Sequence, residues 1–321
     1  MRLLKYAFAL AMGLVAASTI AQAQTVGFAT LPAGAINNVQ AQVIAKVVQQ
    51  NSKLKVRVTP YRGTTAVAAA VQKQQSEFGI TDVVDLTDAL TGVGAFKGRK
   101  HPDLRVVFRI LAFPVTVFVR KDSPIKTIAD LKGKRYPTKW VAFSNGIPMS
   151  EAILNTADLG WKDLSSVPVT NIISAANDFK SGKLDSFLFA VGAPKVAEIN
   201  SAVGGVRALS VGDIPAATKK VKAIRSDYFI IPLKPAPPFA GILGPTNVLG
   251  SDLIIYANAK VSDDTVYNFL KSVIGQKSAL VKGHPTFRAH VPALMGKQFQ
   301  TAQYHPGAIK LLKEKGLWKG K

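Results

Sequence analysis

Two short stretches of the chain, "SEFGITDVVD" at residues 76–85 and "SGKLDSFLFAVG" at residues 181–192, share one pattern. In both, a helix-like or turn-forming stretch leads into a short apolar run that stops at polar or small residues. An apolar run bounded by such signals predicts a buried strand. Because the pattern returns about a hundred residues later, we expect two similar α/β lobes that face each other across a ligand.

The chain before residue 76 alternates strand and helix signals. Val26 and Phe28 read as the end of a strand, and apolar residues recur at helical spacing over 36–48. Thr64 or Thr65 is placed to cap a second helix, which follows a second strand. This order predicts a parallel sheet with helices on its faces, and ligands of such sheets bind beyond the carboxyl ends of the strands. The predicted strand ends are residues 29–34, 61–65 and 81–82.

The middle of the chain carries the signals of a crossing between lobes. A nearly continuous β-rich run over 104–119 contains Pro114, and proline demotes or bends a strand. We interpret this bend as the passage into the second lobe, and a strong strand over 252–261 as the return. Residues 123–135 are expected to form a short capped helix. The predicted architecture is a hinged α/β clamshell, with residues 24–114 and 240–321 in the first lobe and 115–239 in the second.

Residues 1–23 have the three parts of a secretory signal peptide. "MRLLK" is basic, "YAFALAMGLVAA" is a short apolar core, and "AQA" at 21–23 supplies small residues for cleavage. The apolar core is too short for a transmembrane anchor, which needs about 20 apolar residues. We therefore predict cleavage between Ala23 and Gln24, export to the periplasm, and a mature chain that does not itself span the membrane.

The composition restricts the partners of the chain. Cysteine is absent, which excludes disulfides, thiolate metal sites and a lipid-anchor cysteine. Lysine and arginine number 41 against 19 aspartates and glutamates, a formal net charge of +22, or +20 once Arg2 and Lys5 leave with the signal. This charge favours anionic partners such as small carboxylates, although a generally basic surface explains it equally well. Nucleic acid is discounted, because the basic residues are scattered singly and an exported chain rarely meets it.

Three stretches carry a resemblance to a known family. They are "VRKDSPIKTIADLKGKR" at 119–135, "AANDFKSGKLDSFLFAVGAP" at 175–194 and "YHPGAIKLLKEKG" at 304–316. With these stretches in this order, the chain resembles the TAXI-type solute-binding proteins of TRAP transporters over essentially its whole mature length. The resemblance implies a two-lobed periplasmic binding protein, type II-like, that closes on a small organic anion such as a dicarboxylate, a keto acid or glutamate. It also implies delivery to a sodium-coupled TRAP permease, with no cofactor, and we expect a monomer.

The resemblance places the ligand in five loops. They correspond to residues 30–35, 62–64, 81–82, 144–146 and 189–192. The candidate ligand-binding residues are Thr30, Leu31, Gly34, Arg62, Gly63, Thr64, Thr81, Asp82, Ser144, Asn145, Gly146, Phe189 and Gly192. Three loops depart from the family pattern. This chain has "TLPAGA" where the family has a glycine-rich opening loop, and Arg62-Gly63 where the family has a Gly-Gly turn. It has "AFSNGIP" where the family has a Gly-Ser-Gly-Thr loop. The ligand identity depends on these loops, whereas the fold does not.

Each candidate also has a purely structural interpretation. Arg62 either holds a carboxylate in a bidentate fork or is a solvated turn residue. Residues 144–146 precede a helix expected near Pro148, where they bind an anion or only form the turn. Asp82 is interpreted as the cap of the next helix, with reception of a ligand's amino group as the alternative. Phe189 is either an apolar wall of the site or part of the core.

An enzyme and a sensory receptor are the alternatives to a transport function. No G-x-S-x-G motif occurs, and the four histidines lie outside any recognisable catalytic or metal-binding arrangement. We therefore predict no enzymatic activity and no metal site, and a periplasmic hydrolase is the less favoured alternative. His305 is interpreted as part of a turn that closes the fold. A clamshell that signals to a membrane kinase would have the same sequence features, so this alternative stays open.

Overall fold

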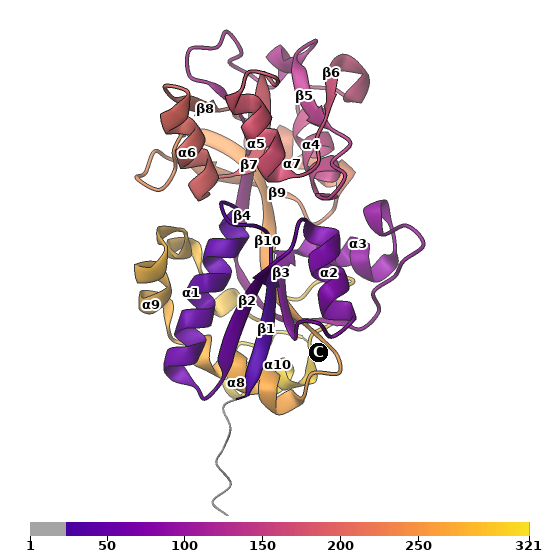
Figure 1. Ribbon diagram of the computed structural model, residues 1–321, viewed down its shortest axis with the longest axis vertical. Coiled ribbons are helices and arrows are strands. Elements are labelled where there is room, and N and C mark those ends of the chain that lie inside the picture. Colours follow the sequence, from indigo (N-terminus) through magenta and orange to yellow (C-terminus); the bar gives the residue numbers. More distant parts are fainter. Residues whose placement is uncertain (1–23, 321) are drawn as a thin grey trace, which may run out of the picture.

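The chain folds into two lobes joined by two long strands (Figure 1). The computed structural model describes residues 24–320, and the predicted signal peptide lies outside them. Lobe I comprises β1 (Thr25–Thr30), α1 (Ile36–Asn51), β2 (Lys55–Pro60), α2 (Thr64–Gln72), β3 (Phe78–Asp82), α3 (Val83–Thr91), α8 (Asp263–Val273), α9 (Lys277–Gly283) and α10 (Pro306–Glu314). Lobe II comprises β5 (Arg135–Thr138), α4 (Gly146–Asn155), β6 (Ser165–Pro168), α5 (Ile172–Lys180), β7 (Ser186–Ala190), α6 (Pro194–Ala202), β8 (Val206–Ala208), α7 (Ile214–Ile224) and β9 (Phe229–Leu233). The crossing strands are β4 (Leu104–Arg120) and β10 (Thr246–Asn258).

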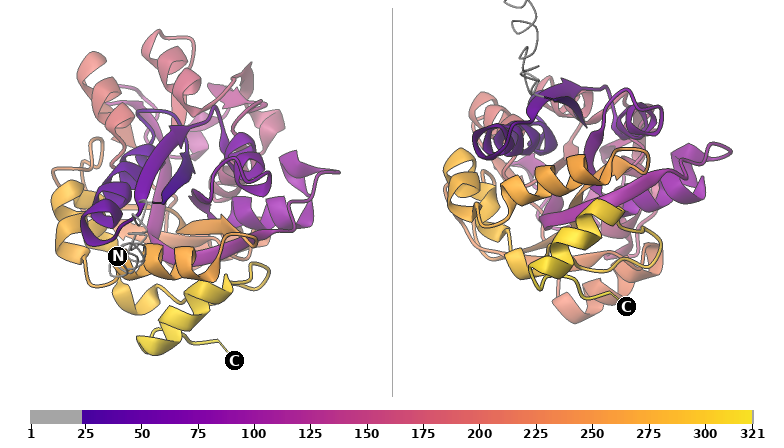
Figure 2. Two further views of the ribbon diagram at one scale, coloured as in Figure 1. Left: turned by 60° about the horizontal axis from the view of Figure 1, so that its bottom comes forward. Right: turned by 90° about the horizontal axis from the view of Figure 1, so that it is seen from below.

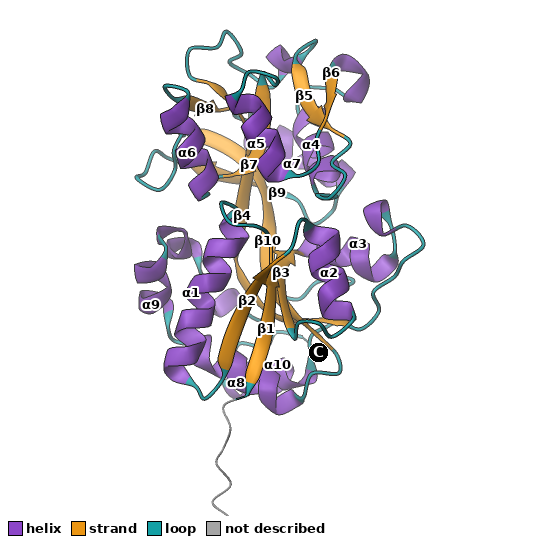
Figure 3. Cartoon of the chain, in the orientation of Figure 1, coloured by secondary structure: helices purple, strands orange, loops and turns teal. Residues whose placement is uncertain are grey.

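The central sheet is mixed, because parallel strands of lobe I adjoin the antiparallel crossing strands. Its order is β2-β1-β3-β10-β4-β7, with β8 also paired to β4 and β9 to β10. β1 pairs in parallel with β2 and β3, whereas β10 runs antiparallel to β3 and β4. A separate parallel pair, β5 and β6, lies in lobe II. Helices lie outside the strands in both lobes (Figure 3), so the predicted two-lobed α/β architecture is confirmed.

The two stretches that share a sequence pattern form β3 and β7. β3 flanks the crossing pair on the side of β10, and β7 flanks it on the side of β4. All five residues of each strand are buried, as expected for short apolar runs covered on both faces. The repeated pattern therefore marks matching strands, one in each lobe.

The crossing strands run through both lobes without a break at Pro114. This residue lies inside β4 opposite Gly250 of β10, so the prediction that it interrupts the strand is wrong. The carbonyl of Pro114 still accepts a hydrogen bond, at 2.9 Å from the Val191 N–H, and only its missing N–H is lost from the sheet. The predicted lobe boundaries fall within β4 and in the loop before β10, and they stay predictions.

Each lobe has its own aromatic core. In lobe I, the Phe78 ring stacks on Phe269 with centroids 4.1 Å apart, and both side chains are fully buried. In lobe II, the Phe187 ring lies 4.7 Å from Phe179 and 5.3 Å from Phe118. Aromatic pairs at these distances add to the hydrophobic gain of burial. Stacked rings therefore stabilise the interior of each lobe.

The end of the chain returns to lobe I. Helices α8 and α10 lie side by side there (Figure 2). The Ser262 side chain caps α8 by accepting from Thr265 N at 3.2 Å, and His305 Nδ1 caps α10 by accepting from Gly307 N at 3.2 Å. The interpretation of His305 as a turn residue is confirmed by this cap.

The short helix predicted over 123–135 is largely absent. A single 3₁₀ turn forms at Ala129–Leu131. The carboxylate of Asp130 accepts from the backbone N–H groups of Lys126 and Thr127, both at 2.9 Å. This side-chain turn uses the N–H groups that start a helix, and such turns compete with helix formation.

Candidate functional site

The two lobes are held together by polar contacts around the loop that precedes α4. The Ser144 hydroxyl donates to Asp85 Oδ1 at 3.2 Å, and Thr64 Oγ1 lies 3.0 Å from Ser144 Oγ. Since the hydroxyl hydrogen of Ser144 points to Asp85, Thr64 is the donor in the second contact. The amide of Asn145 donates to the Asp82 carboxylate. These bonds join lobe II to lobe I, and the clamshell is therefore closed.

Two glycines bring the backbones of the lobes close together. Gly34 has φ 91°, in the left-handed region that glycine favours, and its carbonyl accepts from Lys195 N of α6 at 3.2 Å. A Cβ atom on Gly63 would lie 1.4 Å from the carbonyl oxygen of Ala142 in lobe II. The closed arrangement therefore requires glycine at position 63.

A small cavity lies between the lobes, at the carboxyl ends of β1 and β3. Its volume is about 20 Å³, enough for roughly one water molecule. The polar residues that line it are Asn37, Thr64, Thr81, Asp82 and Asn145. The large apolar residues that line it are Leu31, Ile36, Phe113, Phe143, Ile172 and Phe189. Because both lobes contribute walls, separating them would enlarge this cavity into a cleft.

Asp82 belongs both to a helix cap and to the cleft. It is the last residue of β3, and its Oδ1 accepts from the N–H groups of Val84 and Asp85 at 3.0 and 3.2 Å. This is a standard N-cap for α3, so the interpretation of Asp82 as a cap is confirmed. Its second oxygen faces lobe II and accepts from Asn145. The cap fixes the carboxylate in place at the cavity wall.

The cleft side of α3 is strongly acidic. Asp82, Asp85 and Asp88 follow each other at intervals of one helical turn, and all three are buried. Burial raises the pKa of Asp82 to about 7, against the hydrogen bonds that lower it. Burial and the neighbouring carboxylate of Asp82 raise the pKa of Asp85 to about 8. Burial also raises the pKa of Asp88, although Arg225 Nη2 lies 3.5 Å away and opposes the shift. Keeping these groups charged inside the closed cleft is therefore unfavourable.

The structure brings many of the predicted residues together at the cavity. Those that line it are Leu31, Thr64, Thr81, Asp82, Asn145 and Phe189, and Ser144 bonds beside it. Thr30 is fully buried at the end of β1, and its hydroxyl has no partner. The predicted cap of α2 by Thr64 or Thr65 is wrong. The N-cap is Gly63, and the Thr64 hydroxyl points to Ser144 instead.

Arg62, Gly146 and Gly192 are three of the seven predicted residues that do not line the cavity; the other four are Thr30, Gly34, Gly63 and Ser144. The Arg62 side chain is exposed and does not line the cavity. Gly146 begins α4, two residues earlier than expected, and packs under the Trp140 ring. Gly192 has φ 83° and approaches Thr286, at the base of lobe II. The loops that contain these residues reach the interface, but these side-chain positions face elsewhere.

Several lining residues were not predicted from the sequence. Phe113 comes from β4, Phe143 from the loop before α4, and Ile172 from the start of α5. Nothing in the sequence distinguishes these apolar residues from core residues. Asp85 was the detectable omission, because carboxylates three residues apart on a helix share a face.

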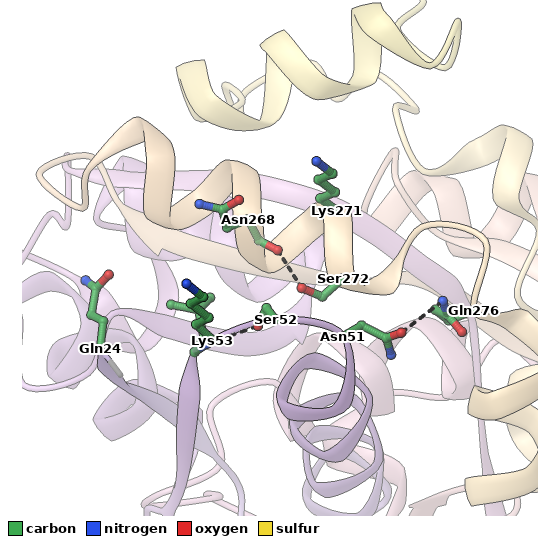
Figure 4. Close-up of a pocket in the computed structure, with 9 residues that line it drawn as sticks. Gln24, Asn51, Ser52, Lys53, Asn268, Lys271, Ser272 and Gln276 are labelled. Carbon is green, nitrogen blue, oxygen red and sulfur yellow. Dashed lines mark hydrogen bonds between the residues drawn. The ribbon is translucent and has the colours of Figure 1, made fainter. Parts of the chain in front are cut away.

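Another cavity, larger than the one between the lobes, lies elsewhere on lobe I. It has a volume of about 490 Å³ and lies between the end of α1 and α8 (Figure 4). Its side chains bond within or between these helices, for example Gln276 Nε2 to Asn51 Oδ1 at 3.3 Å and Ser272 Oγ to the Asn268 carbonyl at 2.6 Å. None of the described side chains that line it is both buried and unpartnered. We therefore do not assign a ligand to it.

Two kinds of feature are absent from residues 24–320. No helix there is both long and apolar enough to cross a membrane. No group of three or more histidine, cysteine, aspartate or glutamate side chains within the same residues is placed to hold a metal ion.

The fold matches known solute-binding proteins at low sequence identity. The alkanesulfonate-binding protein SsuA from Xanthomonas axonopodis pv. citri, bound to MOPS, aligns with a TM-score of 0.51 and 14% identity, over 94% of this chain and 96% of that one. PhnD1 from Prochlorococcus marinus, in complex with methylphosphonate, aligns with a TM-score of 0.53 and 12% identity, over 92% and 99%. A binding protein component of an ABC phosphonate transporter from Pseudomonas aeruginosa aligns with a TM-score of 0.52 and 10% identity, over 92% and 85%. The fold is therefore that of the periplasmic binding proteins.

The family assignment follows from the sequence as a whole. The NMT1-like family model matches residues 21–316, which include nearly all of both lobes. The crossing strands, the lobes on either side and the cleft between them all lie within the matched region. This chain belongs to the NMT1-like family.

Proposed function

We propose that this chain is an extracytoplasmic receptor that captures one small solute between its lobes and passes it to a membrane transporter. The observation that carries the proposal is the cleft itself. Its walls come from both lobes, its polar groups meet at the carboxyl ends of β1 and β3, and the strands β4 and β10 cross from one lobe to the other. Such a site opens and closes as the lobes move about the crossing strands.

The mechanism is capture by closure. The open form exposes the cavity walls, and a bound solute adds contacts to both lobes that only the closed form allows. The solute therefore shifts the equilibrium toward closure by its differential affinity for the two forms. The contacts of Ser144 and Asn145 with lobe I also stabilise the closed form. A solute larger than one water must replace some of these contacts.

The residues that line the cavity do not support the anionic ligand that the sequence favoured. A carboxylate bound as expected would face a cationic side chain, but none of the thirteen described residues lining the cavity is lysine or arginine. Arg62, the candidate cation, is exposed. The fold relatives bind a sulfonate buffer and methylphosphonate, and their low identity carries neither ligand to this chain.

Two observations bear on the class of the transporter, and they favour different classes. The resemblance to TAXI-type proteins favours a TRAP permease driven by sodium, whereas one fold relative serves an ABC phosphonate transporter. We retain the TRAP partner as the proposal, since it rests on residues of this chain. Uptake by proteoliposomes that contain the cognate permease distinguishes the two. A sodium gradient drives uptake through a TRAP system, and ATP drives it through an ABC system.

The receptor function is tested by binding and shape together. A panel of small carboxylates, sulfonates, phosphonates, amines and amino acids is screened by thermal unfolding of the purified chain. A ligand at about a hundred times its Kd stabilises the fold by roughly 2.7 kcal/mol. Isothermal titration then gives the stoichiometry, and small-angle X-ray scattering gives the shape. We expect one ligand per chain and a closed form at saturation. Binding with no effect on the open and closed populations, or conversion of the ligand to a product, would contradict the proposal.

A further inference from the structure

The cleft contains a hydrogen-bond acceptor that the closed structure leaves without a donor. Asn145 is 2% exposed, its Nδ2 donates to Asp82, and its Oδ1 has no partner. Asn145 lines the cavity beside the carboxylate of Asp82. A buried acceptor without a donor is costly, so a ligand that donates hydrogen bonds would be stabilised here.

The buried carboxylates of the cleft have no cationic partner of their own. Asp85 is 2% exposed and accepts only from neutral groups, Ser144 Oγ and Thr81 Oγ1, both at 3.2 Å. Asp82 accepts from backbone N–H groups and from the amide of Asn145. A buried carboxylate that meets only neutral donors gains far less than one that meets a cation.

The nearby cations are already paired. Lys195, at the contact between α6 and the Gly34 loop, donates to Glu198 at 2.8 Å. Arg225 lies 3.5 Å from Asp88, at the far end of the acidic face of α3. Although the chain carries 41 lysines and arginines, the Asp82–Asp85 end of that face is left to neutral donors. None of the described residues that line the cavity is a lysine or arginine that could pair with these carboxyl groups, although the net charge of the chain is positive.

We propose that the cleft binds its solute through a cationic group with N–H donors, an ammonium, amidinium or guanidinium, held by the Asp82 carboxylate and Asn145 Oδ1. This inference rests on the proposed receptor function and specifies its ligand class. The apolar body of the solute then packs against Phe113, Phe143 and Phe189, which line the same cavity. The cation replaces the contact between Asn145 and Asp82, and each of these residues keeps a hydrogen-bond partner.

Three probes of nearly one shape test the sign of the charge. Benzamidine, benzamide and benzoate are planar and similar in size, and they are cationic, neutral and anionic at pH 7.5. Isothermal titration of the purified chain is expected to give at least tenfold tighter binding of benzamidine than of benzamide, and no binding of benzoate. Phenethylamine and 3-phenylpropanoate repeat the comparison with a flexible body. Tighter binding of the anion in either set, or no binding of either cation, overturns the proposal.

Matched variants place the cation in the cleft. Asp82→Asn keeps the cap of α3, because asparagine and aspartate are equally good N-caps. It is expected to abolish the preference for benzamidine over benzamide, and Asn145→Ala to weaken benzamidine binding about tenfold, a size typical of a lost hydrogen bond to a charged group. Asp264→Asn, on the exposed start of α8, is the control and should leave the preference unchanged. An unchanged preference in Asp82→Asn overturns the proposal.

Different experimental results would contradict the proposed ligand class and the proposed receptor function. Closure around a sulfonate or carboxylate, seen by small-angle scattering, would retain the receptor and overturn the cationic ligand. Binding of benzamidine at Asp82 with no closure would retain the cation site and overturn capture between the lobes.

Discussion

The ends of β3 and β7 differ in chemistry, although the strands match in position. After β3, the carboxylate of Asp82 caps α3 and faces the cleft. After β7, the chain turns through Gly192 with φ 83°, and α6 begins at Pro194 with no side-chain cap. The same sequence pattern thus ends in an acid in lobe I and in small apolar residues in lobe II. The apolar runs build the two lobes, and the residues that end them make the two walls of the cleft different.

The largest effects are expected when the two cores are compared. Phe269→Ala in lobe I and Phe187→Ala in lobe II each remove a fully buried ring that packs on neighbouring rings. We expect each to lower the free energy of unfolding by about 3–5 kcal/mol. Urea unfolding followed by circular dichroism measures the change. Leu243→Ala, at a side chain that is 53% exposed, is the control and should change it by less than about 0.5 kcal/mol. A loss below about 1 kcal/mol in one lobe would show that its core is not independent.

Blocking closure is expected to have the next largest effect. In Gly63→Ala, the new Cβ would meet the Ala142 carbonyl at 1.4 Å when the lobes are closed, so one lobe must move. The backbone of Gly63 is extended, with φ −172°, so alanine is not strained within lobe I. We expect ligand affinity to fall about a hundredfold, or ~2.7 kcal/mol, with little change in folding. Isothermal titration measures the affinity.

A matched glycine makes this test specific. Gly244→Ala places a Cβ where no atom lies within 4 Å, and it should bind ligand like the unaltered chain. If Gly63→Ala binds equally well, the closed arrangement is not the one that holds the ligand.

Much of the fold could be predicted from the sequence because it depends on short apolar runs. The strands at β3, β7 and β10, the helix over 36–51 and the caps at Asp82 and Ser262 were all recognisable from periodicity and capping residues. The errors arose where a side chain had a second use. The Thr64 hydroxyl bonds across the cleft instead of capping its helix, and the Asp130 carboxylate accepts from two backbone N–H groups in a turn where a helix was expected.

The site could be predicted less completely, because its chemistry depends on contacts between distant residues. The loops near 30, 64, 82 and 145 were identified, and their residues meet at one cavity. The acidic character of the cavity wall was not identified. The net charge of +22 favoured an anion, whereas the buried groups of the cleft are the acids of α3. A net charge counts every charged residue alike, so it does not show which few of them are buried together.

The acidic wall of lobe I should make closure sensitive to pH. The pKa values of Asp82 and Asp85 are raised to about 7 and about 8 in the closed form, from 3.8 in water. Closure therefore takes up protons between pH 4 and 8, so the empty closed form loses stability as the pH rises through this range. Asp88 adds to this trend, and Arg225 opposes it. Small-angle scattering of the empty chain should show a larger radius of gyration at pH 8.5 than at pH 5.

One substitution tests whether these acids cause the pH dependence. Asp85→Asn keeps the size of the side chain and removes its proton uptake. The pH dependence of the radius of gyration should be reduced in this variant. If the two profiles coincide, the carboxylates of α3 do not govern closure.

The smallest effect is expected from a single hydroxyl on the wall of lobe II. Ser144→Ala removes the donor to Asp85 and the acceptor of Thr64, the two contacts that one side chain makes with lobe I. Because the lost donor serves a buried carboxylate, we expect the empty closed form to be destabilised by about 1–2 kcal/mol relative to the open form. The ratio of closed to open molecules should fall about tenfold, which small-angle scattering at pH 6 detects. Ser201→Ala, on an exposed position of α6, is the control. An unchanged closed population in Ser144→Ala would mean that Asn145 and the Gly34 contact hold the lobes together without it.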